Sequence, residues 1–203
     1  MIWEEDGLFT LKTENTQYLF MKGSAGHLEH LYYGKNYAHP SKEALHQKNE
    51  FLVGNGVAYS TEEKSLNLEN LSQEISTLGK GDIREPFLSV TTKNGAQTRD
   101  FLYESHNIFA GKAEYSGLPS SCGNDDEVET LVVTLEDKNS ELTLLLKYHV
   151  YEKRDVITRS AELINNEKEP VRINRFMSNQ LDLPEGEYSL TTFTGAWARE
   201  MEK

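Results

Sequence analysis

The stretch LTLLLKYHVY (Leu142–Tyr151) decides the fold class, because its side chains alternate with a period of two. One face of the run carries Leu142, Leu144, Leu146, Tyr148 and Val150. The other face carries Thr143, Leu145, Lys147, His149 and Tyr151. Successive side chains of a β-strand point to opposite faces, so the pattern predicts a strand with one face in the core and one partly wet. The run Thr130–Leu135, joined to it by the polar Glu136–Ser140, predicts a hairpin.

Similar short runs recur along the whole chain and predict an all-β fold, a large antiparallel sandwich of roughly ten to fifteen strands. The further expected strands are Phe9–Lys12, Tyr18–Lys22, Phe87–Thr92, Thr98–Tyr103, Val171–Met177 and Tyr188–Phe193, together with two β-type runs in Tyr151–Leu163. Lys93-Asn94-Gly95 predicts a hairpin between Phe87–Thr92 and Thr98–Tyr103, because Asn and Gly tolerate positive φ. Helix signals are poor, and only Ser41–Gln47 and Leu66–Ile75 are expected to form short helices.

The chain shows no Pro/Gly/Ser linker, no low-complexity tract and no internal repeat, so residues 1–203 are expected to form one domain. Tyr37–Gln73 is polar and weakly periodic. We expect this stretch to be an excursion from the sandwich or a long loop, and such loops tend to be functional.

Charge and cysteine content restrict the possible partners. The net charge is −12 and no basic stripe occurs, which disfavours nucleic acid and anionic membrane surfaces. A sugar or another protein remains open as the partner. Cys122 is the only cysteine, Met1–Gly7 lacks the features of a leader, and no apolar run is long enough to span a membrane. We therefore expect a cytoplasmic protein with reduced thiols.

Most residues that invite a chemical role are better explained by structure. His27 and His30 form an H-x-x-H pair, but in a strand they point to opposite faces, so we expect structural histidines and no metal site. Asp82 lies in a turn rich in glycine and is expected to bind local amides or Arg84. Cys122 precedes an acidic run that disfavours a thiolate. No nucleotide-binding or nucleophile motif occurs, and no cofactor is predicted.

Trp197 has two possible roles. It follows Gly195 and lies between Ala196 and Ala198, so little bulk beside it covers the ring. An exposed tryptophan stacks on the apolar face of a galactose ring and donates its indole N–H to a hydroxyl. Composition alone favours the alternative, a tryptophan in the core or at a domain interface. Arg199 either binds a sugar or carboxylate or is solvated.

Several motifs occur in a consistent order along nearly the whole chain. They are His30–Lys35, Leu71–Pro86 with its Gly-Asp-Ile-Arg-Glu-Pro ending, Asp100–Tyr103 with Ser105-His106, Gly111-Lys112, Gly117-Leu118-Pro119, Asp155–Ser160 and Gly195–Glu200. In this order they resemble the N-terminal region of glycoside hydrolase family 36, the microbial α-galactosidases. Ile83 stands where the family pattern has phenylalanine.

The resemblance implies a β-sandwich that precedes a catalytic (β/α)8 barrel in a retaining α-galactosidase acting on α-galactosides of the melibiose and raffinose type. The family's two catalytic aspartates belong to the barrel, whose motifs and alternating pattern are missing here, so no catalytic residue is assigned. Members are often tetramers in which N-terminal domains reach neighbouring active sites. That arrangement implies a place at the rim of the sugar pocket for Trp197, Arg199 and the Tyr37–Gln73 excursion. In many relatives the excursion holds a sugar-binding aspartate, where this sequence has Asn49.

We therefore predict the N-terminal, non-catalytic domain of a cytoplasmic α-galactosidase, whose partners are its own barrel, α-galactosides and further copies of the enzyme. One alternative is a free-standing carbohydrate-binding sandwich, for which two tryptophans, Trp3 and Trp197, are few. The other is an aldose-epimerase-like sandwich enzyme, which would use His106 or His149 with a nearby glutamate.

Overall fold

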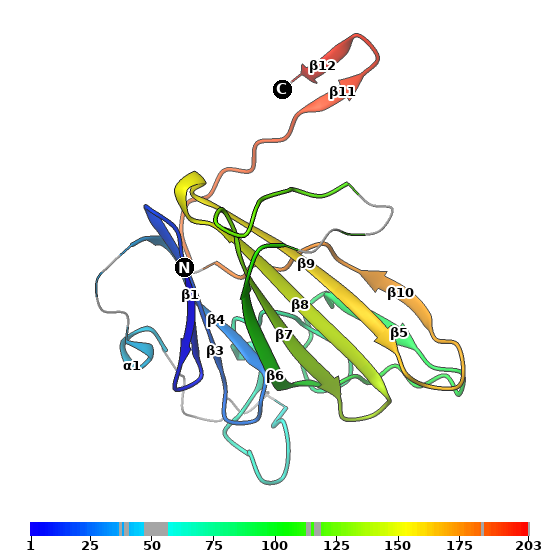
Figure 1. Ribbon diagram of the computed structural model, residues 1–203. Helices are drawn as coiled ribbons and strands as arrows, with labels where there is room; N and C mark the ends of the chain where they lie inside the picture. The colour runs from blue at the N-terminus through cyan, green and yellow to red at the C-terminus, as the bar shows by residue number, and fades with distance from the viewer. Residues whose placement is uncertain are drawn as a thin grey trace.

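The structure is a computed structural model that describes residues 1–36, 38, 41–46, 57–112, 115, 119–183 and 185–202. Its sheets are antiparallel, which confirms the all-β prediction. One sheet contains β1 (Ile2–Glu5), β2 (Leu8–Lys12), β3 (Thr16–Lys22) and β4 (Leu28–Lys35). A second contains β6 (Phe101–Ala110), β7 (Glu129–Asp137), β8 (Leu142–Tyr151) and β9 (Val156–Asn165). Two strand pairs are β5 (Leu88–Thr91) with β10 (Arg172–Phe176), and β11 (Thr194–Ala196) with β12 (Arg199–Glu202) (Figure 1).

Helical structure is sparse, as expected. The α-helix α1 (Lys42–Leu45) lies within the predicted range Ser41–Gln47, and residue 47 lies outside the described residues. Two 3₁₀ turns cover Leu68–Asn70 and Glu152–Arg154. No helix in the described part of the chain is long and apolar enough to cross a membrane.

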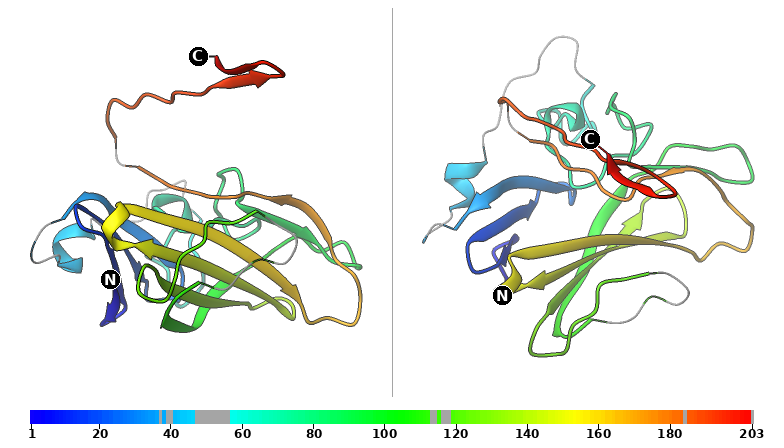
Figure 2. Two further views of the ribbon diagram at one scale, coloured as in Figure 1. Left: turned by 45° about the horizontal axis from the view of Figure 1, so that its top comes forward. Right: turned by 90° about the horizontal axis from the view of Figure 1, so that it is seen from above.

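Residues 72–77 join the first sheet to the β5–β10 pair. The Glu74 N–H donates to the carbonyl of Leu28 on β4 at 2.9 Å, and the Leu88 N–H of β5 donates to the carbonyl of Ser76 at 3.2 Å. Two isolated β-bridges accompany these bonds. The first sheet and the β5–β10 pair therefore form one layer, which faces the layer of β6–β9 (Figure 2).

The core lies between these two layers. The predicted inner face of β8 is confirmed, because each of its five residues is at most 1% exposed. Residues of both layers meet there: Phe9, Phe20, Leu88 and Val90 from one, and Leu131, Leu144, Leu146 and Tyr148 from the other. The rings of Phe9 and Phe20 stack with centroids 4.7 Å apart. Burial of this apolar surface is the main favourable contribution to folding.

A charged group occupies the middle of this core. The carboxylate of Glu74, which is 1% exposed, accepts hydrogen bonds from the hydroxyls of Tyr18 at 2.6 Å and Tyr148 at 2.5 Å. The guanidinium of Arg159 on β9 lies 3.2 Å from the same carboxylate. Burial alone would raise the pKa of Glu74, but Arg159, His30 and Tyr148 outweigh it and lower the pKa. Glu74 is therefore ionised and paired.

The helix predicted at Leu66–Ile75 is wrong. Only Leu68–Asn70 forms a 3₁₀ turn, and Gln73 then pairs with Glu29 of β4 in an antiparallel bridge. Pairing with strands on both sides and burial of the Glu74 carboxylate outweigh the weak local preference for helix.

The hairpin predicted around Lys93-Asn94-Gly95 is also wrong. A tight turn does form there, with Gly95 at φ 86°, but β5 pairs with β10 and β6 pairs with β7 in the opposite layer. The chain changes layers because the Asp100 N–H donates to Asp137 on β7 at 2.7 Å and the buried guanidinium of Arg99 lies 3.4 Å from the same carboxylate.

The strand predicted at Tyr188–Phe193 is displaced along the chain. These residues form no strand, and pairing begins at Thr194, with Thr194 opposite Glu202 and Ala196 opposite Arg199. The other predicted strands are confirmed within a few residues of their expected bounds, except that the strand predicted at Thr98–Tyr103 begins at Phe101 and continues to Ala110.

We predict that Glu74→Gln lowers the free energy of unfolding by about 3–5 kcal/mol, because it leaves the buried Arg159 without its carboxylate. Urea unfolding of the chain measures the change. Glu62→Gln is the matched control, since Glu62 is fully exposed and should change stability by less than about 0.5 kcal/mol. A Glu74→Gln variant as stable as the control would show that the ion pair contributes little.

Candidate functional site

The C-terminal part of the chain leaves the sandwich as an arm. The arm, residues 181–202 as far as they are described, begins against the sandwich, where Asp182 pairs with Arg84. It then leaves both layers and ends in the β11–β12 hairpin (Figures 1 and 2). Trp197 and Ala198 form the turn of this hairpin, and Ala198 has φ 59°. The Trp197 side chain is 97% exposed. The ring is therefore presented at the tip of the arm, and it does not belong to the core of this chain.

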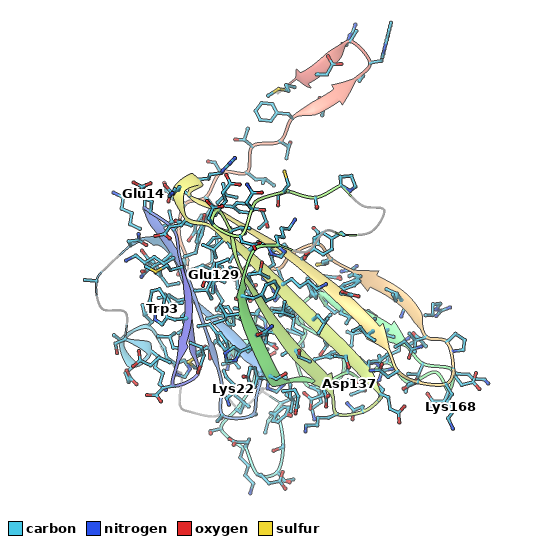
Figure 3. All side chains as sticks on the ribbon, viewed as in Figure 1. Trp3, Glu14, Lys22, Glu129, Asp137 and Lys168 are labelled. Carbon is cyan, nitrogen blue, oxygen red and sulfur yellow. The ribbon has the colours of Figure 1, made fainter. Side chains whose placement is uncertain are left out.

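Other large apolar side chains of the arm are exposed as well. They are Leu181, Leu183, Tyr188, Leu190, Phe193 and Met201, with exposed fractions from 37% to 92%. The arm therefore carries several uncovered apolar side chains on one segment of the chain, and large exposed apolar patches mark interaction sites in soluble proteins. The second tryptophan, Trp3, lies on β1 in the sandwich (Figure 3) and is 37% exposed.

Two of the three residues predicted at the rim of a sugar pocket lie together in the structure, and the third is not described. Trp197 and Arg199 are close together on the hairpin, since Arg199 lies opposite Ala196 in the β11–β12 register, and both are exposed. Asn49 lies outside the described residues. The structure thus brings two of the three predicted residues to one tip.

The residues interpreted as structural have the expected partners. His27 lies 3.0 Å from Asp100, whereas His30 lies 3.5 Å from Glu74, so the H-x-x-H pair diverges as predicted. Among the described residues no group of three metal-binding side chains occurs.

Asp82 also behaves as predicted. Its carboxylate accepts bonds from Arg84 Nε and Nη2, both at 2.9 Å, and from Gln73 Nε2 at 2.7 Å. Arg84 in turn donates to the carbonyls of Leu71 at 2.7 Å and Leu68 at 3.0 Å. These bonds give Asp82 and Arg84 a structural role in the Gly-Asp-Ile-Arg turn.

A groove on the outer face of β8 and β9 was not predicted from the sequence. We call it the outer groove; it has a volume of about 740 Å³. Its lining includes Lys112, Tyr115, Ser120, Ser121, Lys147, His149, Thr158, Ser160 and Glu162. Tyr115 lies 34 residues before His149 and 45 before Ser160, so no short motif could reveal the site.

A chain of hydrogen bonds crosses the outer groove, and its direction follows from the available protons. The Thr130 hydroxyl donates to the carbonyl of Gly111 at 2.5 Å, so it must accept from His149 Nδ1, 2.8 Å away. His149 Nε2 is then the unprotonated nitrogen and accepts from the Tyr115 hydroxyl at 2.9 Å. Tyr115 consequently accepts from Ser160 Oγ at 2.5 Å.

His149 is neutral in this arrangement. Burial, followed by the positive charges of Lys112 and Lys147, lowers the pKa of His149 to about 4. Both ring nitrogens are engaged, which disfavours the aldose-epimerase alternative for His149. His106 packs edge-on against Phe9 and shares a 2.8 Å hydrogen bond with the Tyr103 hydroxyl, which disfavours that role for His106 too.

Comparison with known proteins identifies the family. The family model described as the glycosyl hydrolase family 36 N-terminal domain matches residues 26–203. The chain belongs to glycoside hydrolase family 36. Its similarity to the family's N-terminal domain confirms the resemblance inferred from the ordered motifs.

Relatives from several bacteria share this region. The chain is 33% identical to the bifunctional α-galactosidase/sucrose kinase AgaSK of Mediterraneibacter gnavus, covering 95% of this chain and 20% of the relative. It is 31% identical to α-galactosidase AgaA of Geobacillus stearothermophilus, covering 95% of this chain and 26% of the relative.

Solved structures of family 36 enzymes share the fold. The α-galactosidase from Lactobacillus brevis has a TM-score of 0.87 at 33% identity, over 96% of this chain and 26% of that one. AgaA A355E D548N in complex with raffinose has a TM-score of 0.81 at 30% identity, over 87% of this chain and 24% of that one. The chain therefore spans about a quarter of the length of these family 36 relatives.

We predict that His149 makes stability fall as the pH drops from about 6.5 to about 4. In the unfolded chain the pKa of His149 is about 6.5, so on acidification the unfolded state takes up a proton before the folded state does. Acid therefore favours unfolding between these two pKa values. The slope is at most about 1.4 kcal/mol per pH unit. Urea unfolding at a series of pH values should show this component in the wild type and not in His149→Gln. Parallel curves for the two proteins would contradict the assignment.

Proposed function

We propose that this chain is the non-catalytic N-terminal β-sandwich domain of a retaining α-galactosidase that removes terminal α-galactosyl residues from substrates of the melibiose and raffinose type. Membership of family 36 and the α-galactosidase activity of the relatives support this proposal. In it, residues 1–203 form one domain, which packs against the enzyme's own (β/α)8 barrel. The parent enzyme is cytoplasmic, in keeping with the single Cys122.

Trp197 carries the more specific part of the proposal. The ring is 97% exposed at the tip of a hairpin that extends from the sandwich, and Arg199 lies beside it. Because the tryptophan ring is not packed in the core of its own domain, it is available to stack on a sugar face. The guanidinium of Arg199 can donate hydrogen bonds to sugar hydroxyls. We infer that the tip lines the rim of the galactosyl pocket, together with Asn49 from the excursion.

The exposed apolar side chains of the arm support a role in assembly. Leu190 and Met201 are 92% and 73% exposed, and burying such side chains against a protein surface would stabilise a complex by roughly 1.5–3 kcal/mol each. We propose that the arm contacts the barrel of its own enzyme or that of a neighbouring copy in a tetramer.

A free-standing carbohydrate-binding domain is the second candidate, favoured by the same exposed Trp197. It differs in requiring sugar affinity from the chain alone. Titration of the chain with raffinose would then quench tryptophan fluorescence, and Trp197→Ala would remove the quenching. Under the first proposal the isolated chain shows no saturable change.

We predict that the 203-residue chain does not hydrolyse 4-nitrophenyl α-galactoside, whereas the full-length enzyme assayed beside it does. The reason is that the two catalytic aspartates implied by the family belong to the barrel. Release of nitrophenol is followed by absorbance at equal protein concentrations. Turnover by the chain alone, above that of a heat-denatured sample, would overturn the non-catalytic assignment.

We predict that Trp197→Ala in the full-length enzyme raises the KM for raffinose about tenfold, which corresponds to about 1.4 kcal/mol of lost binding. The thermal midpoint should stay within about 2 °C of the wild type, because the ring is exposed in the domain. Trp3→Ala is the control, since it removes the same ring from β1 in the sandwich. An unchanged KM in Trp197→Ala would exclude Trp197 from the pocket.

A further inference from the structure

We propose that the outer groove on β8 and β9 binds an anionic ligand that also carries hydroxyl groups, the chemical class of sugar phosphates and sugar acids. This site is separate from the Trp197 tip and does not depend on the role proposed for it. Four features of the groove carry the inference: its charge, its free donors, its free acceptors and its size.

The groove is locally positive on a strongly acidic protein. The chain has a net charge of −12, yet the described residues that line the groove include Lys112 and Lys147 against one carboxylate, that of Glu162. Arg159, which also lines the groove, is balanced by the buried Glu74. The two lysines are among the causes that lower the pKa of His149, so their field acts on the buried side of the groove as well. A cleft of one sign raises the local concentration of oppositely charged ligands.

Hydrogen-bond donors remain available at these lysines. Lys112 Nζ donates to the carbonyl of Ser121 at 2.5 Å, and Lys147 Nζ donates to Glu162 at 2.5 Å. Each ammonium has three N–H groups, so two on each form no hydrogen bond with the described residues. Both ammonium groups lie over the ring of Tyr115, at 5.0 and 5.3 Å from its centroid. Tyr115 therefore lies close to both lysine cations of the groove.

Hydrogen-bond acceptors lie beside them. The Ser160 hydroxyl donates its proton to the Tyr115 oxygen, so towards a ligand it can act only as a hydrogen-bond acceptor. The buried Thr158 hydroxyl, on the same face of β9, has no hydrogen-bond partner within the described part of the chain. An unpaired buried hydroxyl costs about 1–3 kcal/mol, which a ligand hydroxyl could recover. A ligand that carries both kinds of group would match this arrangement. Its anionic group would accept from the lysines, and its hydroxyls would donate to Ser160 and Thr158.

The volume sets the size of the ligand. At about 740 Å³ the groove falls within the range of roughly 300–1,000 Å³ typical of small-molecule sites. An inorganic phosphate would leave most of this space to water. A monosaccharide or disaccharide bearing a phosphate or carboxylate would reach both the lysines and the hydroxyls of β9.

Isothermal titration calorimetry of the 203-residue chain at low ionic strength tests the inference, with galactose 6-phosphate, galacturonate, inorganic phosphate and galactose as probes. We expect saturable binding of galactose 6-phosphate or galacturonate, weaker binding of phosphate and no binding of galactose. Binding of only one of the two sugar anions would identify the anionic group. Galactose binding as tightly as its phosphate, or no saturable heat with either sugar anion, would overturn the proposal.

Variants locate the binding. Lys112→Gln and Lys147→Gln should each weaken binding of the sugar anion by about tenfold or more, since each removes a charged donor. Lys93→Gln is the matched control, because it removes the same charge and an exposed 2.7 Å ion pair with Glu169 outside the groove. Circular dichroism checks that each variant is folded. If Lys147→Gln does not fold, the binding loss in Lys112→Gln alone tests the site. An equal loss in Lys93→Gln would show unspecific attraction and overturn the proposal.

Discussion

The ion pair between Glu74 and Arg159 is the constraint on which the rest of the structure depends. Transferring a carboxylate and a guanidinium out of water costs several kcal/mol each, and well-packed apolar residues often stabilise a core equally well. The main contribution of the ion pair is therefore to position the segments that carry it, and its net contribution to stability is secondary. Tyr18 from β3, Tyr148 from β8 and Arg159 from β9 all bind the same carboxylate. These three contacts hold residues 72–77 in the position that joins β4 to β5.

The same guanidinium also fixes the start of the arm. Arg159 donates to the carbonyl of Gln180 at 2.9 Å and to Asn179 at 3.1 Å. The side-chain oxygen of Gln180 accepts from the N–H of Ser76 at 2.9 Å, and its amide nitrogen donates to the carbonyl of Gln73 at 3.2 Å. The segment that leads to the hairpin is thus bound to the closing segment of the layer. The start of the arm is consequently held from within the core.

The sequence predicted those parts of the fold whose signal is local. The alternation in Leu142–Tyr151 predicted both the strand and its buried face, because a single apolar face is sufficient to orient a strand. The segment 72–77 and the outer groove were not predicted, since their partners are distant in sequence: Glu74 meets Tyr148 across 74 residues and Arg159 across 85. The ordered motifs did identify the family and directed attention to Trp197, but no local pattern could show that its ring is exposed.

The arm and the outer groove differ in the physical basis of their binding, which separates their roles. The arm exposes apolar side chains, so association there is driven by burial of apolar surface and responds little to salt. The outer groove presents Lys112 and Lys147, whose attraction for an anion is screened over about 8–10 Å at physiological ionic strength. A change in salt concentration therefore acts on the groove while leaving contacts of the arm nearly intact. Both sites nevertheless depend on β9, because Arg159 anchors the arm on its inner face while Thr158 and Ser160 line the groove on its outer face. Alternation along one strand thus lets adjacent residues serve an assembly surface and a ligand site independently.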